Sequence, residues 1–426
     1  MDTIVALATA QGRAGVAVIR VSGPQAFACC EALAGVVPEP RVVRLSVLRD
    51  AAGERIDHGL VLVFDENRSF TGEKTVEFQI HGSQPVVAAM LRACLAVEGV
   101  RAAEPGEYTK RAFLNGQMDL TEVEALADLI DAETEGQRRQ AMQVLDGSAG
   151  RLVDALREDL LQSLAILEAA MDFSDEELPD DLTPMVVAPL DRVLGSLSQQ
   201  LSGRAAAESV RDGFEVAIIG RVNAGKSTLL NVLAGRDAAI TSERAGTTRD
   251  VIEVRMDIGG LSVTLIDTAG LRETEDEIER LGIDRGQARA AQADLRVFLK
   301  AEPEDAPVGV SEGDIVVLSK ADLWGEEGVS GVTGEGVAAL ISRIEAILRE
   351  KTKGSSVFMR ERHFDKLARA VDSLTRAKAE LLSPASAWEI ASEDLRAALR
   401  SLDGIVGRVD IEDVLGRIFS SFCIGK

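Results

Sequence analysis

The sequence of 426 residues is poor in aromatic side chains, histidine and cysteine, and each shortage argues against a kind of core or site. Aromatic residues make up 4% of the chain, so the core must be aliphatic, which favours a helix-rich architecture. The three histidines are scattered without metal-ligand spacing. The cysteines show neither C-x-x-C spacing nor a disulfide framework, and they are Cys29, Cys30, Cys94 and Cys423. We therefore expect a reducing, cytoplasmic location.

Long apolar runs and an excess of positive charge are also absent. No stretch approaches the roughly 18–20 apolar residues that cross a bilayer, so we expect no membrane association. The apolar run near the start, 3–10, is too short for a secretory signal. The net charge of −23 argues against nucleic-acid binding through the overall field, although a local basic patch or a partner protein could still bind it.

The pattern along the chain predicts a multidomain protein of α/β and α classes. Residues 1–118 read as mixed α and β, with strands expected at 3–9, 16–21, 61–64 and 75–80 and a helix at 85–97. Residues 119–212 read as helical, with helices expected from Asp119 and at 153–171 and 189–201. Residues 213–350 alternate strand and helix, with buried strands expected at 214–219, 261–266 and 314–318. This predicts a doubly wound domain inserted into a helical one, because 361–422 is helical again.

The segment Gly220-Arg-Val-Asn-Ala-Gly-Lys-Ser227 has the Walker A pattern G-x4-G-K-[ST]. Its glycines let backbone N–H groups surround phosphates, Lys226 places a charge at the β and γ phosphates, and Ser227 offers a hydroxyl to magnesium. A Gly-rich turn is the alternative. The expected strand before it and helix at 227–234 after it favour a nucleotide site formed by Asn223, Ala224, Gly225, Lys226, Ser227 and Thr228.

Two later segments fit the same chemistry. In Gly246-Thr-Thr-Arg-Asp250, Thr248 is the expected switch residue that closes on magnesium and the γ phosphate. In Asp267-Thr268-Ala269-Gly270, Asp267 would hold magnesium through water and the Gly270 N–H would sense the γ phosphate. A turn at a strand end is the alternative for this second segment, but its position directly after the expected strand 261–266 argues against it.

Guanine specificity is predicted by Ser319-Lys320-Ala321-Asp322, which follows an expected strand. Asp322 can accept two hydrogen bonds from the guanine edge, and Lys320 can cover the base. Ser319 stands where the pattern has Asn, which costs about 1 kcal/mol of polar contact, so we expect specificity for GTP with reduced affinity. Ser330 and Gly331 begin a loop expected behind the base.

The residue that assists hydrolysis is harder to place. Leu271 stands where a Ras-like enzyme has the Gln that orients water, and it cannot take that role. The segment 272–280 is rich in carboxylates. Most of them are expected to form a solvated acidic loop, and one could orient water.

Together these segments resemble the MnmE (TrmE) tRNA-modification GTPases, and the resemblance spans the whole chain. It is carried by Gly220–Ser227, by the run from Asp267 to Ile283, and by Phe422-Cys423-Ile424-Gly425-Lys426 at the end. Ser69-Phe-Thr-Gly-Glu73 and Arg111-Ala-Phe-Leu-Asn115 add to it. The resemblance implies an N-terminal α+β folate-binding and dimerisation domain (1–118), a helical domain in two parts (119–212 and 351–426) and a GTPase domain (213–350).

The resemblance also implies roles for residues that the motifs alone do not identify. Two GTPase domains would meet across potassium, bound by Asn223, Ser242, Arg244 and Thr247. Glu279 matches the family's water-orienting glutamate. The loop that contacts GTP would comprise Ser242, Glu243, Arg244, Ala245, Gly246, Thr247 and Thr248.

For the modification itself, the resemblance implies a folate site at Arg20, Glu77, Gln117 and Lys426, with 5-formyl- or methylene-tetrahydrofolate as the ligand. Gln117 stands where the family usually has Lys, and this removes a cation. Cys423 matches a family cysteine needed for modification. The homodimer would join the flavin protein MnmG (GidA), which carries FAD, in a heterotetramer that modifies carbon 5 of the wobble uridine in certain tRNAs.

Other classes of function remain open at this stage. A scaffolding GTPase of the ribosome-assembly type would have the same nucleotide motifs, but it would need neither the folate-like residues nor Cys423. A lipid-anchored GTPase is suggested by the place of Cys423, fourth from the end, but Lys426 is a poor final residue for that signal. The complete phosphate and magnesium set argues against a folate-binding protein without enzyme activity.

Overall fold

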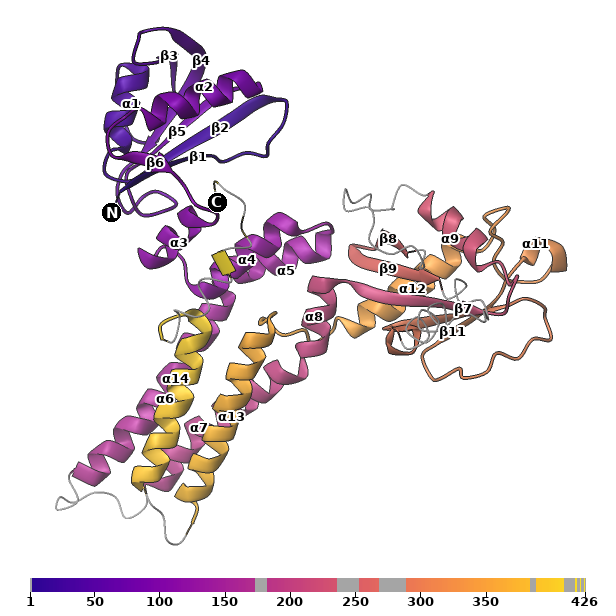
Figure 1. Cartoon of the computed structure of the whole chain (residues 1–426). Helices are drawn as coiled ribbons and strands as arrows, with labels where there is room; N and C mark the ends of the chain where they lie inside the picture. Colours follow the sequence, from indigo (N-terminus) through magenta and orange to yellow (C-terminus); the bar gives the residue numbers. More distant parts are fainter. Residues whose placement is uncertain are drawn as a thin grey trace, which may run out of the picture. The chain divides into compact units, whose positions relative to one another are not determined.

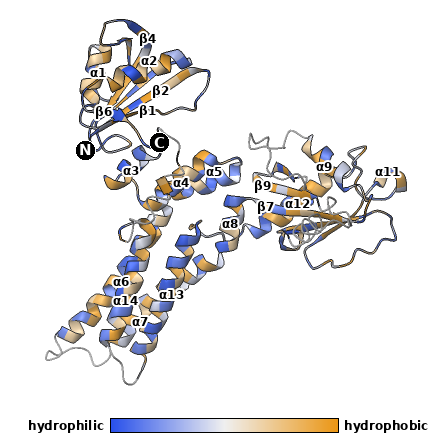
Figure 2. Cartoon of the chain, in the orientation of Figure 1, coloured by the Kyte–Doolittle hydropathy of each residue, from blue (hydrophilic) through white to orange (hydrophobic). Residues whose placement is uncertain are grey.

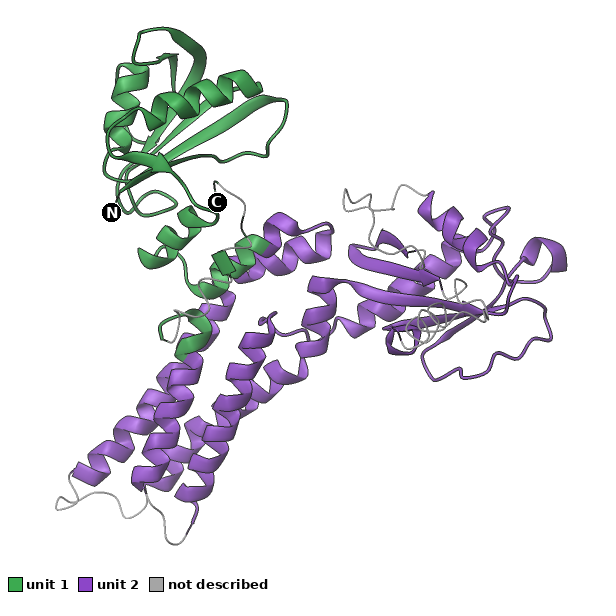
Figure 3. Ribbon diagram, viewed as in Figure 1, with its two compact units in different colours: residues 1–127, 403–426 green, residues 128–402 purple. Residues whose placement is uncertain are grey.

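The computed structural model describes residues 2–172, 182–235, 253–267, 289–383, 388–409, 418–419, 422 and 425 (Figure 1). The chain divides into two compact units (Figure 3). Unit 1 is Met1–Ala127 with Asp403–Lys426, and unit 2 is Asp128–Leu402. Both ends of the sequence therefore belong to one unit.

Unit 1 contains a sheet with strand order β3-β4-β5-β2-β1-β6. Its strands are β1 (Thr3–Leu7), β2 (Ala14–Ser22), β3 (Arg44–Arg49), β4 (Arg55–Phe64), β5 (Thr75–Gly82) and β6 (Val100–Ala102). Neighbours are antiparallel except β1 and β6, which are parallel. The strands expected from sequence correspond to β1, β2, β4 and β5. Strand β3 was not expected because it lies at the sheet edge with little burial, and β6 is too short to show a pattern.

Successive side chains of β1 point to opposite faces of this sheet, and different helices cover the two faces. Val5 packs under α1 (Ala26–Ala34) and α2 (Gln84–Leu95), in the core that also holds Cys29, Cys30 and Cys94. Burial, followed by the neighbouring Cys29 and Glu31, raises the pKa of the Cys30 thiol to about 12. Cys30 is thus a neutral core side chain.

The other face of the sheet receives α3 (Glu107–Leu114). Ile4 and Ala6 alternate with Val5 and pack against Tyr108 of that helix. The C-terminal residues of unit 1 lie on the same region: Phe419 and Phe422 pack with Val123 of α4 (Leu120–Asp131). Helix α4 begins where the sequence predicts, since Asp119 and Glu122 exchange hydrogen bonds between side chain and backbone at 2.8 and 2.9 Å.

Unit 2 contains a helical part and an α/β part. The helical part includes α5 (Glu135–Leu145), α6 (Ser148–Asp172), α7 (Thr183–Ser202), α8 (Arg204–Asp212), α13 (Glu361–Leu381) and α14 (Trp388–Val406). Polar and apolar residues both appear along α13 (Figure 2), with Phe364, Leu367 and Leu374 on its buried side. Exposed ion pairs join α14 to α6 and to α13, through Arg396–Glu168 at 2.6 Å and Arg376–Asp394 at 2.7 Å. The chain therefore leaves the helices after α8 and returns to them at α13.

The start of α7 differs most from the sequence prediction. The expected helix over 189–201 is α7, which starts six residues earlier at Thr183 and has Pro189 inside it. Proline has no N–H to donate to the preceding turn, so it usually marks a helix start. Here its ring is buried with Val186, Leu190 and Val193, and that packing offsets the missing hydrogen bond.

The α/β part has a sheet of order β11-β10-β7-β9-β8 over the described residues. Its strands are β7 (Phe214–Gly220), β8 (Glu253–Ile258), β9 (Leu261–Asp267), β10 (Leu295–Lys300) and β11 (Ile315–Leu318). All pairs are parallel except β8 with β9, as is common for an edge strand of a doubly wound sheet. The carboxyl ends of the parallel strands share one edge, where such sheets bind ligands.

The described helices of the α/β part are α9 (Lys226–Ala234), α11 (Ala321–Trp324) and α12 (Val337–Lys351). Wherever the structure describes a helix, that helix falls short of the length or apolar character required to cross a bilayer.

Candidate nucleotide and folate sites

The Walker A segment forms a tight loop between β7 and α9. Its first residue, Gly220, lies so close to β10 that an added Cβ would be 2.9 Å from the Leu299 carbonyl oxygen. Asn223 and Gly225 both have a positive φ, of 63° and 87°. Asn tolerates this region better than most residues, and Gly adopts it freely. The loop thus turns back on itself at the start of α9, and the Asn223 side chain is exposed.

Lys226 is the buried first residue of α9, and its ammonium group points into the loop. It donates to the carbonyl oxygens of Gly220 at 2.7 Å and Arg221 at 2.9 Å. Burial lowers the pKa of Lys226, and the nearby Asp267 carboxylate acts in the opposite direction. A buried cation held by carbonyl groups suits an anionic ligand, because phosphate oxygens can replace those carbonyls.

Ser227 and Asp267 come together across the sheet edge. The Ser227 hydroxyl donates to Oδ2 of Asp267 at 2.9 Å, and Asp267 is 4% exposed at the end of β9. A hydroxyl and a carboxylate are the hard oxygen ligands that magnesium prefers, so these two groups fit the ion. The other residues expected here lie outside the described residues: Ser242, Glu243, Arg244, Ala245, Gly246, Thr247, Thr248, Thr268, Ala269, Gly270 and Glu279.

The expected base-binding segment lies at the same edge, after β11. Ser319 is buried and donates its hydroxyl to the Lys300 carbonyl at 2.9 Å. Lys320 has a φ of 56°, a conformation that is uncommon for a residue with a side chain and tends to occur at functional sites. Asp322 follows in the first turn of α11 and is exposed. The carboxylate expected to recognise guanine is therefore accessible.

Ser330 and Gly331 place the second loop directly on the start of α9. Ser330 is fully buried, and its hydroxyl accepts the N–H groups of Val332 and Thr333 at 3.2 and 3.1 Å. A Cβ added to Gly331 would lie 2.9 Å from the Leu229 nitrogen. Only glycine allows this approach, so the loop expected behind the base is packed against the helix of the phosphate site.

In unit 1, two of the expected folate residues face each other on neighbouring strands. Arg20 of β2 pairs in register with Glu77 of β5, and their side chains form an ion pair at 2.8 Å. The guanidinium carbon lies 5.5 Å from the ring centre of Phe70 and 5.7 Å from that of Tyr108. The Tyr108 hydroxyl donates to the Arg20 carbonyl at 2.6 Å, and burial raises its pKa. The Arg20 guanidinium thus lies close to two aromatic rings.

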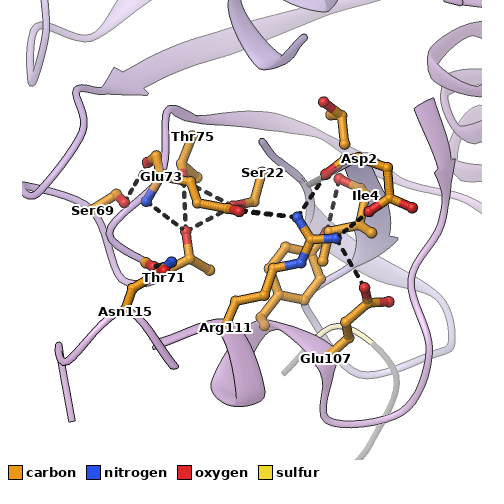
Figure 4. Close-up of polar contacts among 12 residues, drawn as sticks. Asp2, Ile4, Ser22, Ser69, Thr71, Glu73, Thr75, Glu107, Arg111 and Asn115 are labelled. Atoms are coloured by element: carbon orange, nitrogen blue, oxygen red, sulfur yellow. Dashed lines mark hydrogen bonds and ion pairs between the residues drawn. The ribbon is translucent and has the colours of Figure 1, made fainter. Parts of the chain in front are cut away.

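The two N-terminal segments noted in the sequence, 69–73 and 111–115, contact each other. Arg111 is 6% exposed and lies 3.1 Å from Glu73, while the Asn115 amide donates to the Thr71 carbonyl at 2.7 Å. Figure 4 shows Arg111 between the carboxylates of Glu73, Asp2 and Glu107. This network holds the loop that carries Phe70.

Unit 1 also contains Gln117 and the described C-terminal residue Gly425. Gln117 lies beside the same loop, since a Cβ on Gly72 would be 3.1 Å from its Cγ. Gly425 packs against β1, where an added Cβ would lie 2.1 Å from the Leu7 carbonyl oxygen. Leu7 is the register partner of Ile19, next to Arg20. Cys423 and Lys426 lie outside the described residues.

Comparison with known proteins identifies the family. Residues 3–117 match the family profile described as GTP-binding protein TrmE N-terminus, and residues 120–423 match the one described as MnmE helical domain. The tRNA modification GTPase MnmE of Ruegeria pomeroyi is 52% identical over 428 residues, which cover 100% of both chains. The chain belongs to the MnmE family of tRNA modification GTPases. Its arrangement of an N-terminal domain, a helical domain and a P-loop GTPase domain is that of the family.

A second MnmE relative, from Cereibacter sphaeroides, is also 52% identical, over 432 residues and all of both chains. Among solved structures, the G domain of the T. maritima FeoB iron transporter is 23% identical and covers 32% of this chain and 98% of that one. Its TM-score of 0.24 is too low to establish a shared fold. As an MnmE-family protein the chain is a GTP hydrolase that acts in tRNA modification. The scaffolding alternative is therefore not retained.

Sequence reasoning did not identify the aromatic residues beside Arg20 in this MnmE-family chain. Phe70 was noted only as part of a segment, and Tyr108 was not noted at all. One signal could have found Tyr108, because it is the single tyrosine of a chain with few aromatics. It lies directly after Glu107, at the start of a helix with a buried face.

Proposed function

We propose that this chain is a potassium-dependent GTPase that, with the flavin protein MnmG, helps install the 5-carboxymethylaminomethyl or aminomethyl group on the wobble uridine of certain tRNAs. The one-carbon unit comes from a folate. The observation that carries the proposal is the Ser227–Asp267 pair beside the buried Lys226, because together they offer phosphate and magnesium ligands at one sheet edge. Family membership gives the tRNA context.

In the nucleotide site, the loop formed by Asn223, Ala224, Gly225, Lys226, Ser227 and Thr228 binds the GTP phosphates. Ser227 and Thr248 hold magnesium, Asp267 holds it through water, and Gly270 contacts the γ phosphate. Magnesium, when bound, neutralises charge that develops on the phosphates. Asp322 and Lys320 hold the guanine, with Ser319, Ser330 and Gly331 supporting the loops around it. The accessible Asp322 and the strained Lys320 backbone support this assignment.

Hydrolysis is assigned to potassium and Glu279 in a homodimer. Asn223 binds potassium together with Ser242, Arg244 and Thr247, and Glu279 orients the attacking water. The exposed Asn223 side chain beside the phosphate loop supports its part in this site. The rest of the loop at 242–248 contacts GTP, including Glu243, Ala245 and Gly246.

The folate is assigned to unit 1. The Arg20–Glu77 pair, with two aromatic rings close to Arg20, offers charge and stacking surfaces to a pterin and its carboxylates. Gln117 beside Gly72, and Gly425 against Leu7, support the inclusion of Gln117 and of Lys426. Cys423 takes part in the modification. Two chains dimerise through residues 1–118 and join MnmG, which carries FAD, in the cytoplasm.

The domain division of the sequence analysis is part of the same proposal. Residues 1–118 form the folate and dimerisation domain, and residues 213–350 form the GTPase domain. Residues 119–212 and 351–426 form the helical domain. The return of the chain to the helices at α13 supports this last division.

The test is GTP hydrolysis by the full chain in potassium and in sodium at equal ionic strength. We expect potassium to raise turnover by about tenfold or more, which corresponds to at least about 1.4 kcal/mol of barrier. Glu279→Ala should remove this gain, while Glu275→Ala in the same acidic segment should keep it. Equal wild-type rates in the two salts would show that the potassium assignment is wrong.

A further inference from the structure

Both sides of the proposed nucleotide site meet at the end of β10. Gly220, which begins the phosphate loop, is in register with Leu299 and lies against its carbonyl oxygen. On the other side of β10, Ser319 donates its backbone N–H and its hydroxyl to the Lys300 carbonyl, at 2.8 and 2.9 Å. The last two residues of β10 therefore contact the phosphate side and the base side.

A single carboxylate organises the turn that follows β10. The Asp305 side chain is 10% exposed, and its Oδ2 accepts the N–H groups of Ala301 at 2.9 Å and Glu302 at 3.2 Å. Its Oδ1 lies 2.7 Å from Nη1 of Arg221, the second residue of the phosphate loop. Asp305 thus connects this turn to the phosphate loop through an ion pair.

The same turn also contacts the base side. Trp324, the last residue of α11, donates its indole N–H to the Ala301 carbonyl at 3.2 Å. Helix α11 carries Asp322 in its first turn. The Ser319 hydroxyl has one proton, which it donates to Lys300, whereas the Asn of the usual pattern has two donors and an acceptor. Position 319 therefore has no second donor with which to reach the phosphate loop.

We propose that Asp305 is a positioning residue that fixes the phosphate loop relative to the guanine-recognition segment 319–324 through its ion pair with Arg221. The pair makes a connection that the single hydroxyl of Ser319 cannot make. The inference rests on the proposed nucleotide site. A residue in this role affects the affinity of ligands that contact both sides at once. The affinity of a ligand that contacts only one side does not depend on the position of the other side.

The test compares Asp305→Asn with a matched control in the full chain. The amide keeps an acceptor oxygen for the two backbone N–H groups and removes the charge that faces Arg221. The control is Asp314→Asn, because Asp314 pairs with Arg296 at 2.6 Å and accepts the Ser311 N–H at 2.7 Å in the same connecting segment, before β11. Binding of GDP, guanosine and pyrophosphate is measured by competition with a fluorescent guanine nucleotide.

Asp305→Asn should raise the Kd for GDP by about two- to five-fold, since the Arg221 side chain is 75% exposed and exposed ion pairs are weak. The Kd values for guanosine and pyrophosphate should not change, and Asp314→Asn should change none of the three. Arg221→Gln should give the same rise as Asp305→Asn, and the double variant should add nothing further.

Two results would overturn the inference: an unchanged Kd for GDP in Asp305→Asn, or an equal loss of pyrophosphate binding, which marks a merely structural role. Failure of the unchanged chain to bind GDP is a different result. It would overturn the proposed nucleotide site, and the inference with it.

Discussion

The hydroxyl of Ser227 lies 2.9 Å from a carboxylate oxygen of Asp267, although 40 residues separate them in the sequence. The contact follows from the sheet, because Ser227 comes after β7 and Asp267 ends β9, and these parallel strands are neighbours. Their carboxyl ends reach the same edge, so a hydroxyl and a carboxylate meet at the end of the phosphate loop.

This contact predicts how magnesium-dependent hydrolysis responds to loss of either group. Ser227→Ala and Asp267→Asn should each lower GTP turnover by about 100-fold or more, because the first removes a hydroxyl ligand of the proposed ion and the second removes the charge that holds the ion through water. Turnover is measured over a range of magnesium concentrations. The exposed Ser202, at the end of α7, provides the control Ser202→Ala, which should leave turnover unchanged. Full activity in Ser227→Ala would contradict the assignment.

The sequence predicted the elements that carry the strongest local patterns. Continuous apolar runs located β7, β9 and β11, and the Walker A spacing located the start of α9, because buried parallel strands and glycine-rich phosphate loops have distinctive compositions. Pairings between distant segments could not be predicted. The contact of Arg111 with Glu73, and of Asp305 with Arg221, depends on how strands and turns are arranged in space.

We predict that GDP binding requires glycine at position 331, because a side chain there would collide with α9. In Gly331→Ala the new Cβ would lie 2.9 Å from the Leu229 nitrogen and 3.0 Å from the Thr228 carbonyl carbon, both backbone atoms that cannot move alone. Displacement of the loop should cost about 1–3 kcal/mol and weaken GDP binding by about tenfold. Equilibrium titration with a fluorescent guanine nucleotide measures this.

Gly195→Ala is the matched control for this loop, because nothing lies within 4 Å of its added Cβ and it sits inside α7. Alanine favours helix over glycine, so this variant should be slightly more stable and should bind GDP normally. Normal binding in Gly331→Ala as well would show that the loop does not support the site.

Arg20 is predicted to bind the folate through its charge. Arg20→Gln should weaken binding of 5-formyl-tetrahydrofolate by about tenfold or more, since charge-assisted hydrogen bonds contribute about 1.5–3 kcal/mol. Calorimetric titration of the full chain measures this. Arg13→Gln, in the exposed turn before β2, removes the same charge elsewhere and should bind normally. Equal affinities of the two variants would reject the site.

Unit 1 should lose stability in acid through Glu107. Burial raises the pKa of Glu107, but hydrogen bonds from Arg101, the Glu104 N–H and Arg111 outweigh it, and the pKa is lowered from its ordinary value of 4.5. A lowered pKa in the folded state means that the stabilisation is complete above pH 4.5 and is lost as the pH falls through the folded-state pKa.

Urea unfolding followed by the absorbance of Tyr108, the single tyrosine, measures this loss at a series of pH values. Glu107→Gln should be less stable than the unchanged chain at neutral pH, and its stability should fall less steeply below pH 4.5. The exposed Glu98→Gln should follow the unchanged chain. Identical slopes for Glu107→Gln and the unchanged chain would show that Glu107 does not cause the acid sensitivity.

The turn between β8 and β9 is predicted to depend on Gly136 of α5. The Gly136 N–H donates to the Gly260 carbonyl at 2.8 Å, and Glu133 and Arg255 form an ion pair at 3.0 Å beside it. In Gly136→Ala the new Cβ would lie 2.5 Å from the Gly260 carbonyl oxygen, so the turn must move away from the helix. Strain of this kind costs about 1–3 kcal/mol.

Hydrogen exchange checks this prediction, because loss of the contact should speed exchange at the Gly136 amide and along residues 253–262. Since β9 ends at Asp267, a displaced turn should also lower GTP turnover more than GDP affinity. Glu133→Gln removes the neighbouring charge without adding a Cβ, and it should have a smaller effect because exposed ion pairs contribute little. Unchanged exchange at residue 136 in Gly136→Ala would mean that the helix and the turn separate in solution.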